Sequence, residues 1–253
     1  MKRILVIVLT IVLTFITFLL VGFMVLLFTK GIGIDIKNKY VDITKAEIVY
    51  DKEYDVGDIS ISNTSGKIIF KYNDKDNIRV VIYGNDKDEI DSSIDSNINV
   101  KVNEKMCIGL CLLERKIIVY IPYDYNNNIN INTISGDIDI LKGNDINITS
   151  TSGKIKINSV NNLDISNVSG KIDIDSINSS VNIVTTSGKI SINKLDINKD
   201  STLVSVSGDV RVNNTNSNNK VSTVSGKTNI NSNNISNYNL IVNTISGNIY
   251  IGG

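Results

Sequence analysis

The 253-residue chain contains no histidine, no tryptophan, one proline and two cysteines. The lack of histidine removes the commonest general base, the commonest metal ligand, and the Ser-His and Cys-His pairs that activate nucleophiles. No glycine-rich phosphate-binding loop and no zinc-ligand spacing occurs in the sequence. These absences predict a protein that is not an enzyme and that uses no cofactor and no dedicated metal ion.

The chain also lacks an excess of charge of either sign, because 26 Lys and Arg residues balance 26 Asp and Glu residues. A basic surface is the usual electrostatic footprint of a nucleic-acid-binding protein. We therefore expect no nucleic-acid partner.

A single long hydrophobic run, the 25 residues from Ile4 to Phe28, contains no charged residue. About 20 apolar residues suffice to span a bilayer. Lys2 and Arg3 precede the run, which favours a cytoplasmic N-terminus and an exported remainder. A cleaved signal peptide is the alternative, but the run is longer than a signal-peptide core, and residues 28–31 lack a small-x-small cleavage site. We expect a single-pass protein of the cell membrane: a cytoplasmic stub at 1–3, a transmembrane anchor at 4–28, a linker at 29–49 and an extracellular remainder.

The dipeptide Ser-Gly recurs eight times, and the last seven glycines are separated by 17, 17, 18, 20, 18 and 21 residues. A fixed repeat of this length is typical of stacked architectures. The residues of the eight pairs, which we expect to form structural corners, are Ser65, Gly66, Ser135, Gly136, Ser152, Gly153, Ser169, Gly170, Ser187, Gly188, Ser207, Gly208, Ser225, Gly226, Ser246 and Gly247.

Each pair lies in one apolar frame, counted with the glycine as position zero. Positions −5 and +4 are apolar in every copy, and position +2 is apolar in every copy except at Thr228. A period of two with β-branched side chains predicts half-buried strands. Position −2 carries Ile, Val or Thr, which shifts the alternation by one residue and predicts a bend just before Ser-Gly. Glycine suits such a corner because it tolerates positive φ and close backbone approach, and serine can bond the neighbouring backbone.

The repeat length favours a solenoid over a sandwich. About 18 residues at roughly 3.3 Å each give a path of about 60 Å, enough for one full coil. Asn-rich links such as Asn161-Asn162 would also allow the hairpins of a sandwich or barrel. We predict an all-β fold: a parallel β-solenoid with coils of 17–21 residues over 128–253, with like residues stacked on like. An irregular β segment at 50–127 and one N-terminal transmembrane helix precede it.

The segment 50–127 contains further strand signals. Residues 56–61 lead into Ser65-Gly66 in the same frame and are expected to begin the sheet. Strands are predicted at 78–83 and 117–121, and the charged stretch 86–95 is predicted to be a loop. The only proline, Pro122, follows a predicted strand and suits an edge or corner.

Three features have both a functional and a structural interpretation. Cys107 and Cys111 can form a disulfide in an exported protein or remain free thiols. The Asp-x-Asp pairs 137/139 and 173/175 could bind calcium or serve a glycosidase, but lysines at equivalent positions of neighbouring coils favour cross-strand charge pairs. The ten tyrosines could stack on sugars, although core packing and interfaces are their default role.

The stretch Ile-Ile-Val-Tyr-Ile-Pro at 117–122, followed by Ile-Asn-Ile-Asn-Thr-Ile-Ser-Gly-Asp-Ile at 129–138, resembles a bacterial family. This is the putative adhesin family with β-strand repeats, also called LiaG-like, and the resemblance covers roughly residues 50–253. It implies an envelope-associated β-solenoid, tethered near the membrane and linked to envelope stress, with no catalytic residues. The segment around Cys107 and Cys111 departs from the family pattern.

Three hypotheses about function follow. The first is a non-enzymatic, membrane-anchored envelope protein whose solenoid binds a protein or a cell-wall polymer. The second is a structural module that self-associates through the edges of the solenoid. The third, which we rank last, is a polysaccharide-active β-helix enzyme.

Overall fold

The computed structural model describes residues 46–84, 88–94, 97–103, 115–196, 201–215, 219–232 and 240–252. Within these ranges every regular element is a β-strand, and no helix is long or apolar enough to cross a membrane. The run from Ile4 to Phe28 and the cysteines Cys107 and Cys111 lie outside the described residues, so the predictions about them stay predictions.

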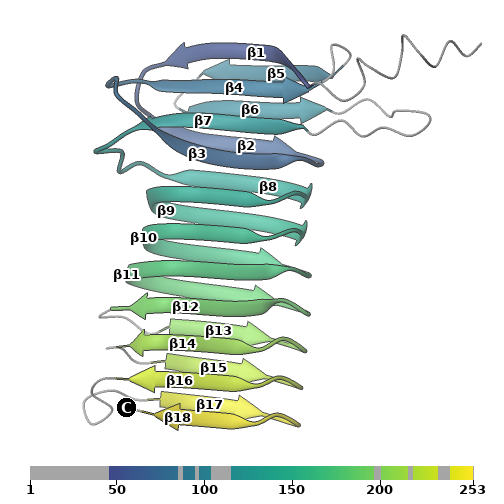
Figure 1. Ribbon diagram of the computed structural model, residues 1–253, viewed down its shortest axis with the longest axis vertical. Helices are drawn as coiled ribbons and strands as arrows, with labels where there is room; N and C mark the ends of the chain where they lie inside the picture. The colour runs from purple at the N-terminus through teal and green to yellow at the C-terminus, as the bar shows by residue number, and fades with distance from the viewer. Residues whose placement is uncertain are drawn as a thin grey trace, which may run out of the picture. The chain divides into compact units, whose positions relative to one another are not determined.

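The strands form a stack of coils (Figure 1). They are β1 (Glu47–Tyr54), β2 (Asp58–Asn63), β3 (Lys67–Asn73), β4 (Ile78–Gly84), β5 (Glu89–Ile94), β6 (Asn97–Asn103), β7 (Lys116–Pro122), β8 (Ile129–Ser135), β9 (Ile138–Ser152), β10 (Ile155–Asn167), β11 (Lys171–Thr185), β12 (Lys189–Leu195), β13 (Ser201–Ser205), β14 (Val210–Thr215), β15 (Asn219–Thr223), β16 (Thr228–Ser232), β17 (Leu240–Thr244) and β18 (Ile249–Gly252).

From β8 onward the chain is a parallel β-solenoid, as predicted. Ile138 pairs with Ile155, Ile155 with Ile172, and Ile172 with Ile190, so position +2 of each coil lies on position +2 of the next. Position −5 behaves in the same way, with Ile148 on Ile165. The predicted stacking of like on like is confirmed. It follows because only one register keeps the apolar side chains at −5, +2 and +4 inside.

The interior of the stack is one continuous hydrophobic core. The side chains at −5, +2 and +4 are buried in the coils of β8 to β14, and nearly all are Ile, Val or Leu. Burying such a side chain contributes roughly 1.5–3 kcal/mol relative to leaving it in water. Because the coils share this core, each coil is stabilised mainly by its two neighbours.

The alternation differs from our expectation just before each corner. Position −3, which is polar, faces inward, whereas the apolar residue at −2 faces solvent: Thr133 and Asn167 are buried, and Ile134 and Val168 are exposed. Odd-numbered positions therefore face inward from −5 to −3. The change to even-numbered positions, +2 and +4, takes place only across the Ser-Gly pair. Our expectation of a shift between −5 and −2 was wrong because it assumed that every apolar residue points inward.

The order of coils in the stack is not the order in the sequence. The coil formed by β2 and β3 lies between that of β6 and β7 and that of β8 and β9, and all these pairings are parallel. Ile61 thus pairs with Ile131 in the first regular coil. The predictions that 78–83 and 117–121 form strands are confirmed by β4 and β7, and residues 56–68 do belong to the sheet through β2 and β3. They do not begin it, because β1 precedes them and pairs with β4.

Antiparallel strands cover the end of the stack where the described chain begins (Figure 1). β4 lies between β1 and β7, and β5 pairs with β6. The predicted loop at 86–95 is wrong for Glu89–Ile94, which forms β5. In β5, Ile90 packs against the core while Asp91 stays exposed.

Candidate functional surface

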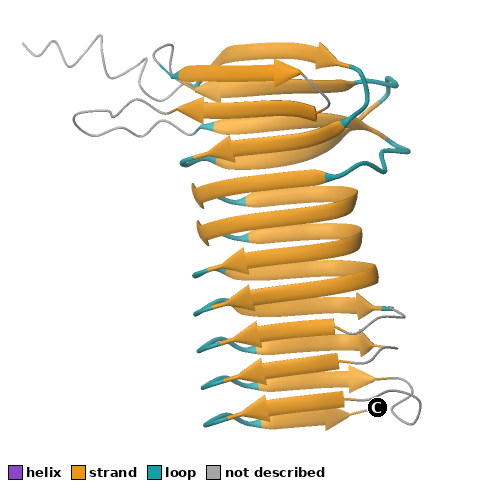
Figure 2. Ribbon diagram, turned by 180° about the vertical axis from the view of Figure 1, so that it is seen from behind, coloured by secondary structure: helices purple, strands orange, loops and turns teal. Residues whose placement is uncertain are grey.

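The Ser-Gly pairs lie at one edge of the stack, where Figure 2 shows the turns arranged in a column. At Gly170 the backbone φ is +126°, a conformation that L side chains rarely adopt. A Cβ atom at Gly170 would also overlap the carbonyl oxygen of Gly153 in the preceding coil. The same overlap with the preceding glycine occurs at Gly136, Gly153, Gly188, Gly208, Gly226 and Gly247. The glycines are thus needed for close approach between coils.

The serines of the pairs link neighbouring coils. The hydroxyl of Ser169 donates to the carbonyl oxygen of Thr151, and that of Ser187 to the carbonyl oxygen of Val168, both at 3.4 Å. Ser152, Ser207 and Ser246 repeat the arrangement at 3.4–3.5 Å. Hydrogen bonds of this length are weak. The serines therefore make small, repeated contributions to the stack.

At two corners the side chain that bonds the backbone of the glycine belongs to position −3, which we did not single out from the sequence. The amide of Gly188 donates to Oγ1 of Thr185 at 3.1 Å, and the amide of Gly208 donates to Oγ of Ser205 at 2.9 Å. A sequence signal was available, because position −3 is polar in every copy: Asn63, Thr133, Ser150, Asn167, Thr185, Ser205, Thr223 and Thr244. A buried polar side chain is retained where it pairs with a backbone group.

The Asp-x-Asp pairs lie on the outer face of the coils, and Asp173 pairs with Lys171 of its own strand and with Lys154 of the preceding coil. Lys171 and Lys154 approach Oδ2 of Asp173 at 2.7 Å and 3.5 Å, and the amide of Lys154 donates to Oδ1 of Asp137. No group of three or more acidic, cysteine or histidine side chains in the described part of the chain could hold a metal ion. Exposed pairs of this kind add at most about 1 kcal/mol.

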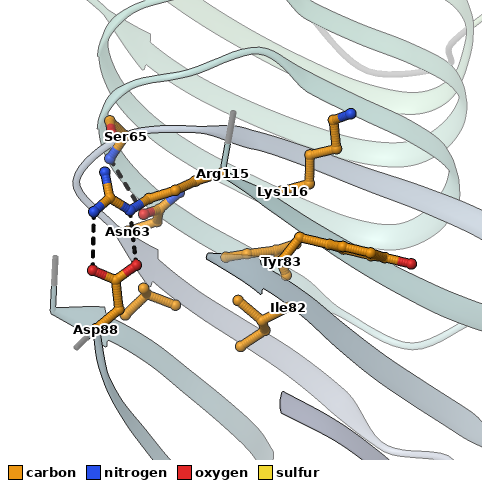
Figure 3. Close-up of a pocket in the computed structure, with 9 residues that line it drawn as sticks. Asn63, Ser65, Ile82, Tyr83, Asp88, Arg115 and Lys116 are labelled. Carbon is orange, nitrogen blue, oxygen red and sulfur yellow. Dashed lines mark hydrogen bonds and ion pairs between the residues drawn. The ribbon is translucent and has the colours of Figure 1, made fainter. Parts of the chain in front are cut away.

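An enclosed ion pair lies near the covered end of the solenoid (Figure 3). The guanidinium of Arg115 donates two hydrogen bonds, at 2.8 and 2.9 Å, to the carboxylate of Asp88, whose side chain is 1% exposed. The cavity beside it, lined by Asn63 and Ile82 among others, has a volume of only about 10 Å³. That space holds about one water molecule at most. The pair therefore fastens the residue before β5 to the residue before β7.

A much larger hollow lies at the edge of the stack opposite the Ser-Gly column. It is a groove of about 370 Å³ between the segment that joins β7 to β8 and the second corners of β9, β10 and β11. The residues that line it are Tyr72, Asn126, Leu141, Lys142, Gly143, Asn158, Ser159, Asn161, Asp175 and Ser176. Figure 1 shows the β7–β8 connection projecting from the stack on the side where β9, β10 and β11 turn.

Tyr72, which lines the groove, stacks on Tyr123. The rings of Tyr72 and Tyr123 lie 4.6 Å apart between centroids and 19° from parallel. Both are exposed, Tyr72 at 41% and Tyr123 at 63%. Tyr125, two residues later, is buried, and its hydroxyl donates to the carbonyl oxygens of Gly57 and Asn128 at 3.2 Å. Burial, with a smaller effect of nearby Asp58, raises the pKa of Tyr125 above its ordinary range.

The fold and this surface define a class: a parallel β-solenoid with a covered N-terminal end, ladders of polar side chains, and no metal cluster in its described part. A sequence model of the family described as Toastrack DUF4097 matches residues 56–252, and the chain belongs to that family. The membership inferred from the Ser-Gly frame and the strand ending in proline is confirmed. No curated protein sequence matches the chain.

Solved structures that align with most of the chain, with TM-scores below 0.5, come from several bacteria. A putative adhesin from Bacteroides fragilis is 14% identical, with a TM-score of 0.47, and the match covers 80% of this chain and 95% of that one. A putative cell adhesion protein from Clostridium sporogenes is 11% identical, with a TM-score of 0.39 and coverage of 80% and 98%. A putative lipid binding protein from Parabacteroides distasonis is 15% identical, with a TM-score of 0.41 and coverage of 80% and 95%.

Proposed function

We propose that the protein is a non-enzymatic binding module of the bacterial envelope, held at the membrane by residues 4–28 and carrying its solenoid on the outside. The observation that carries the proposal is the combination, in one chain, of an uncharged 25-residue apolar run and a rigid solenoid of the Toastrack DUF4097 family. The run has the length and flanking charges of an anchor. The solenoid offers long polar faces and a groove for a protein or a cell-wall polymer.

The direction in which the chain enters the solenoid fits this arrangement. β1, the first described strand, lies at the covered end of the stack, and the regular coils follow from there (Figure 1). The chain therefore enters the solenoid at its covered end, and the regular coils of β8 to β18 come later in the chain.

Membrane fractionation of the full-length chain in a bacterial host tests the anchor. We expect the protein to stay in the membrane pellet after carbonate washing, to be digested by protease added to intact spheroplasts, and to keep its N-terminus by mass spectrometry. The matched control is the double variant Phe15→Asp, Leu19→Arg, which interrupts the apolar run and should lose membrane retention. A mature protein that begins after residue 28 would show a cleaved signal peptide and contradict the anchor.

We also propose that the module serves the response to envelope stress, which the resemblance to LiaG-like proteins motivates. The test is transcript abundance in the native bacterium before and after a sublethal cell-wall antibiotic. Induction of several-fold is the expected outcome, and unchanged transcript would contradict this part of the proposal. An assay of the purified protein for release of reducing sugar or unsaturated uronide should be negative, and a clean positive would overturn the non-enzymatic assignment.

A second candidate function, self-association, is favoured by the last described coil. Ile249 and Ile251 occupy the frame positions +2 and +4 yet are 41% and 49% exposed, whereas Ile190 and Ile192 at the same positions are buried. β18 carries no charged residue, while β1 at the other end presents exposed Asp51 and Lys52. Charges on an edge strand oppose pairing with another chain. Two copies would therefore meet tail to tail and close as a two-fold dimer, without forming a filament.

Light scattering of residues 31–253 over a range of concentrations tests this second candidate. We expect a concentration-dependent dimer that Ile251→Lys disrupts, because the new charge would lie at the interface. The matched control, Val168→Lys, places a charge on an exposed residue of a central coil and should not change the mass. A monomer at all concentrations would contradict self-association.

A further inference from the structure

The groove between the β7–β8 connection and the corners of β9, β10 and β11 is the larger of the two hollows described above. Its volume of about 370 Å³ falls within the usual range of small-ligand sites. It spans three consecutive coils, so at about 4.8 Å per coil it extends over roughly 10–15 Å along the stack. We propose that this groove binds a saccharide chain, with Tyr72 and Tyr123 as the stacking platform. The proposal deepens the binding role proposed above and rests on it.

The tyrosine pair is held in place before any ligand arrives. The ammonium of Lys142 donates to the carbonyl oxygen of Tyr123 at 3.0 Å, and the amide of Asn144 donates to the carbonyl oxygen of Asn127, also at 3.0 Å. Buried Tyr125 fastens the same connection to the core. A preorganised loop loses less conformational entropy on binding. The backbone of Tyr123 is thus held in place beside Tyr72, and both tyrosine side chains stay exposed to solvent.

The polar groups in the groove are suited to hydroxyl groups. Within the described residues, the side chains of Asn126, Asn158 and Ser159 make no hydrogen bond. Amide and hydroxyl side chains provide donors and acceptors together, as a sugar edge requires. Among the described residues that line the groove, two are charged, Lys142 and Asp175, and their charges are opposite. A neutral, polyhydroxylated ligand fits this lining better than a phosphate or an acyl chain does.

A sugar ring has an apolar face and a rim of hydroxyl groups, which match the tyrosine pair and the polar side chains of the groove. The C–H face of a pyranose is apolar and can lie on an aromatic ring, while its rim carries hydroxyls that need partners. Aromatic residues with one apolar and one wet side are the usual binders of such amphipathic ligands. A peptide would need an open strand edge to add a strand, but the groove lies at corners of β9–β11, whose backbones pair with neighbouring coils on both sides.

Titration of the full-length protein in detergent with chitohexaose, cellohexaose and xylohexaose, each up to about 10 mM, tests the proposal. Tyrosine fluorescence and calorimetry both serve as readouts, because the chain has no tryptophan. We expect at least one hexasaccharide to bind with a Kd in the micromolar to millimolar range. Tyr123→Ala should weaken that binding about ten-fold or more, and Tyr123→Phe should keep it within about three-fold, because the ring supplies the platform.

The matched control is Tyr250→Ala, which removes an exposed tyrosine of β18, far along the chain from the groove. It should bind as the wild type does. Asn158→Leu provides a second variant in the groove and should weaken binding without touching the aromatic pair. Failure of all three sugars to bind would overturn the saccharide proposal, as would binding that both Tyr123→Ala and Asn158→Leu leave unchanged. Neither result would bear on the membrane anchor, which is tested separately by fractionation.

Discussion

Two kinds of residue make each corner of the solenoid, and they act in different ways. The glycine is needed because its missing side chain lets the coils approach, whereas the polar residue at −3 bonds the amide of the glycine, as at Gly188 and Gly208. The glycine could be found from the sequence because it does not vary. The polar residue at −3 was overlooked because Asn, Ser and Thr resemble ordinary loop residues until their burial is known.

The first prediction compares Gly170→Val with Asn167→Ser. Valine at Gly170 would combine a strained φ with a backbone overlap, so we expect it to lower the free energy of unfolding by about 3 kcal/mol or more. Serine at Asn167 should cost about 1 kcal/mol or less, because serine serves at −3 in other coils and Nδ2 of Asn167 has no hydrogen-bond partner among the described residues. Thermal and urea denaturation measure both. Equal melting temperatures would show that the glycine corner is not strained.

The second prediction concerns the alkaline stability of the loop that carries the tyrosine platform. Burial raises the pKa of Tyr125 in the folded state, so its stabilising contribution is complete below about pH 10 and is lost as the pH rises further. Tyr125→Phe should cost about 1 kcal/mol at pH 7, where two hydrogen bonds disappear. The difference in unfolding free energy between Tyr125→Phe and the wild type should shrink between pH 9 and pH 11, because a tyrosine in the unfolded chain loses its proton at about pH 10. Urea denaturation across this range measures it, and parallel pH profiles would contradict the assignment.

At the scale of the strand, the sequence predicted the register but not the phase before the corner. Stacked isoleucines define the register because any slip would expose them. The phase could not be predicted, since an apolar residue at −2 tolerates exposure and a polar residue at −3 tolerates burial once it is hydrogen-bonded. β5 was missed for a related reason: four of its six residues are polar or charged, so the segment carries little hydrophobic pattern.

The third prediction tests this phase with two substitutions in one strand of the β10 coil and its corner. Ile165→Ala removes a fully buried side chain and should cost about 2–4 kcal/mol. Val168→Ala removes an exposed side chain and should change stability by no more than about 0.5 kcal/mol. Chemical denaturation of both variants is sufficient. A larger loss of unfolding free energy for Val168→Ala than for Ile165→Ala would show that position −2 faces the core, as the sequence first suggested.

At the scale of the whole molecule, the features hardest to predict join residues that lie far apart in the sequence. β2 stacks on β8 although the hairpins of the covered end separate them, and no local pattern encodes that order. The groove depends on the same arrangement, because Tyr72 comes from β3 and Tyr123 follows β7, next to it in the sheet. From the sequence, sugar stacking was only one open use of ten tyrosines.

The last prediction concerns how stability is distributed along the stack. A solenoid coil is stabilised by its neighbours, so a terminal coil with one neighbour should open more readily than a central one. β18 pairs only with β16 in the described part of the chain, and its frame isoleucines are exposed, whereas β10 is paired on both sides. We expect the amides of Ile249 and Ile251 to exchange with solvent about 100-fold faster than those of Ile155 and Ile157.

The covered end provides the internal control for this measurement. Val80 and Ile82 of β4 are buried beneath the antiparallel strands, so exchange there should resemble that of the central coils. Hydrogen exchange with mass spectrometry at low protein concentration measures all three regions at once. Equal protection at both ends would contradict the asymmetry of the stack. If β18 becomes protected as the concentration rises while β4 does not change, the open coil is the site where two copies meet.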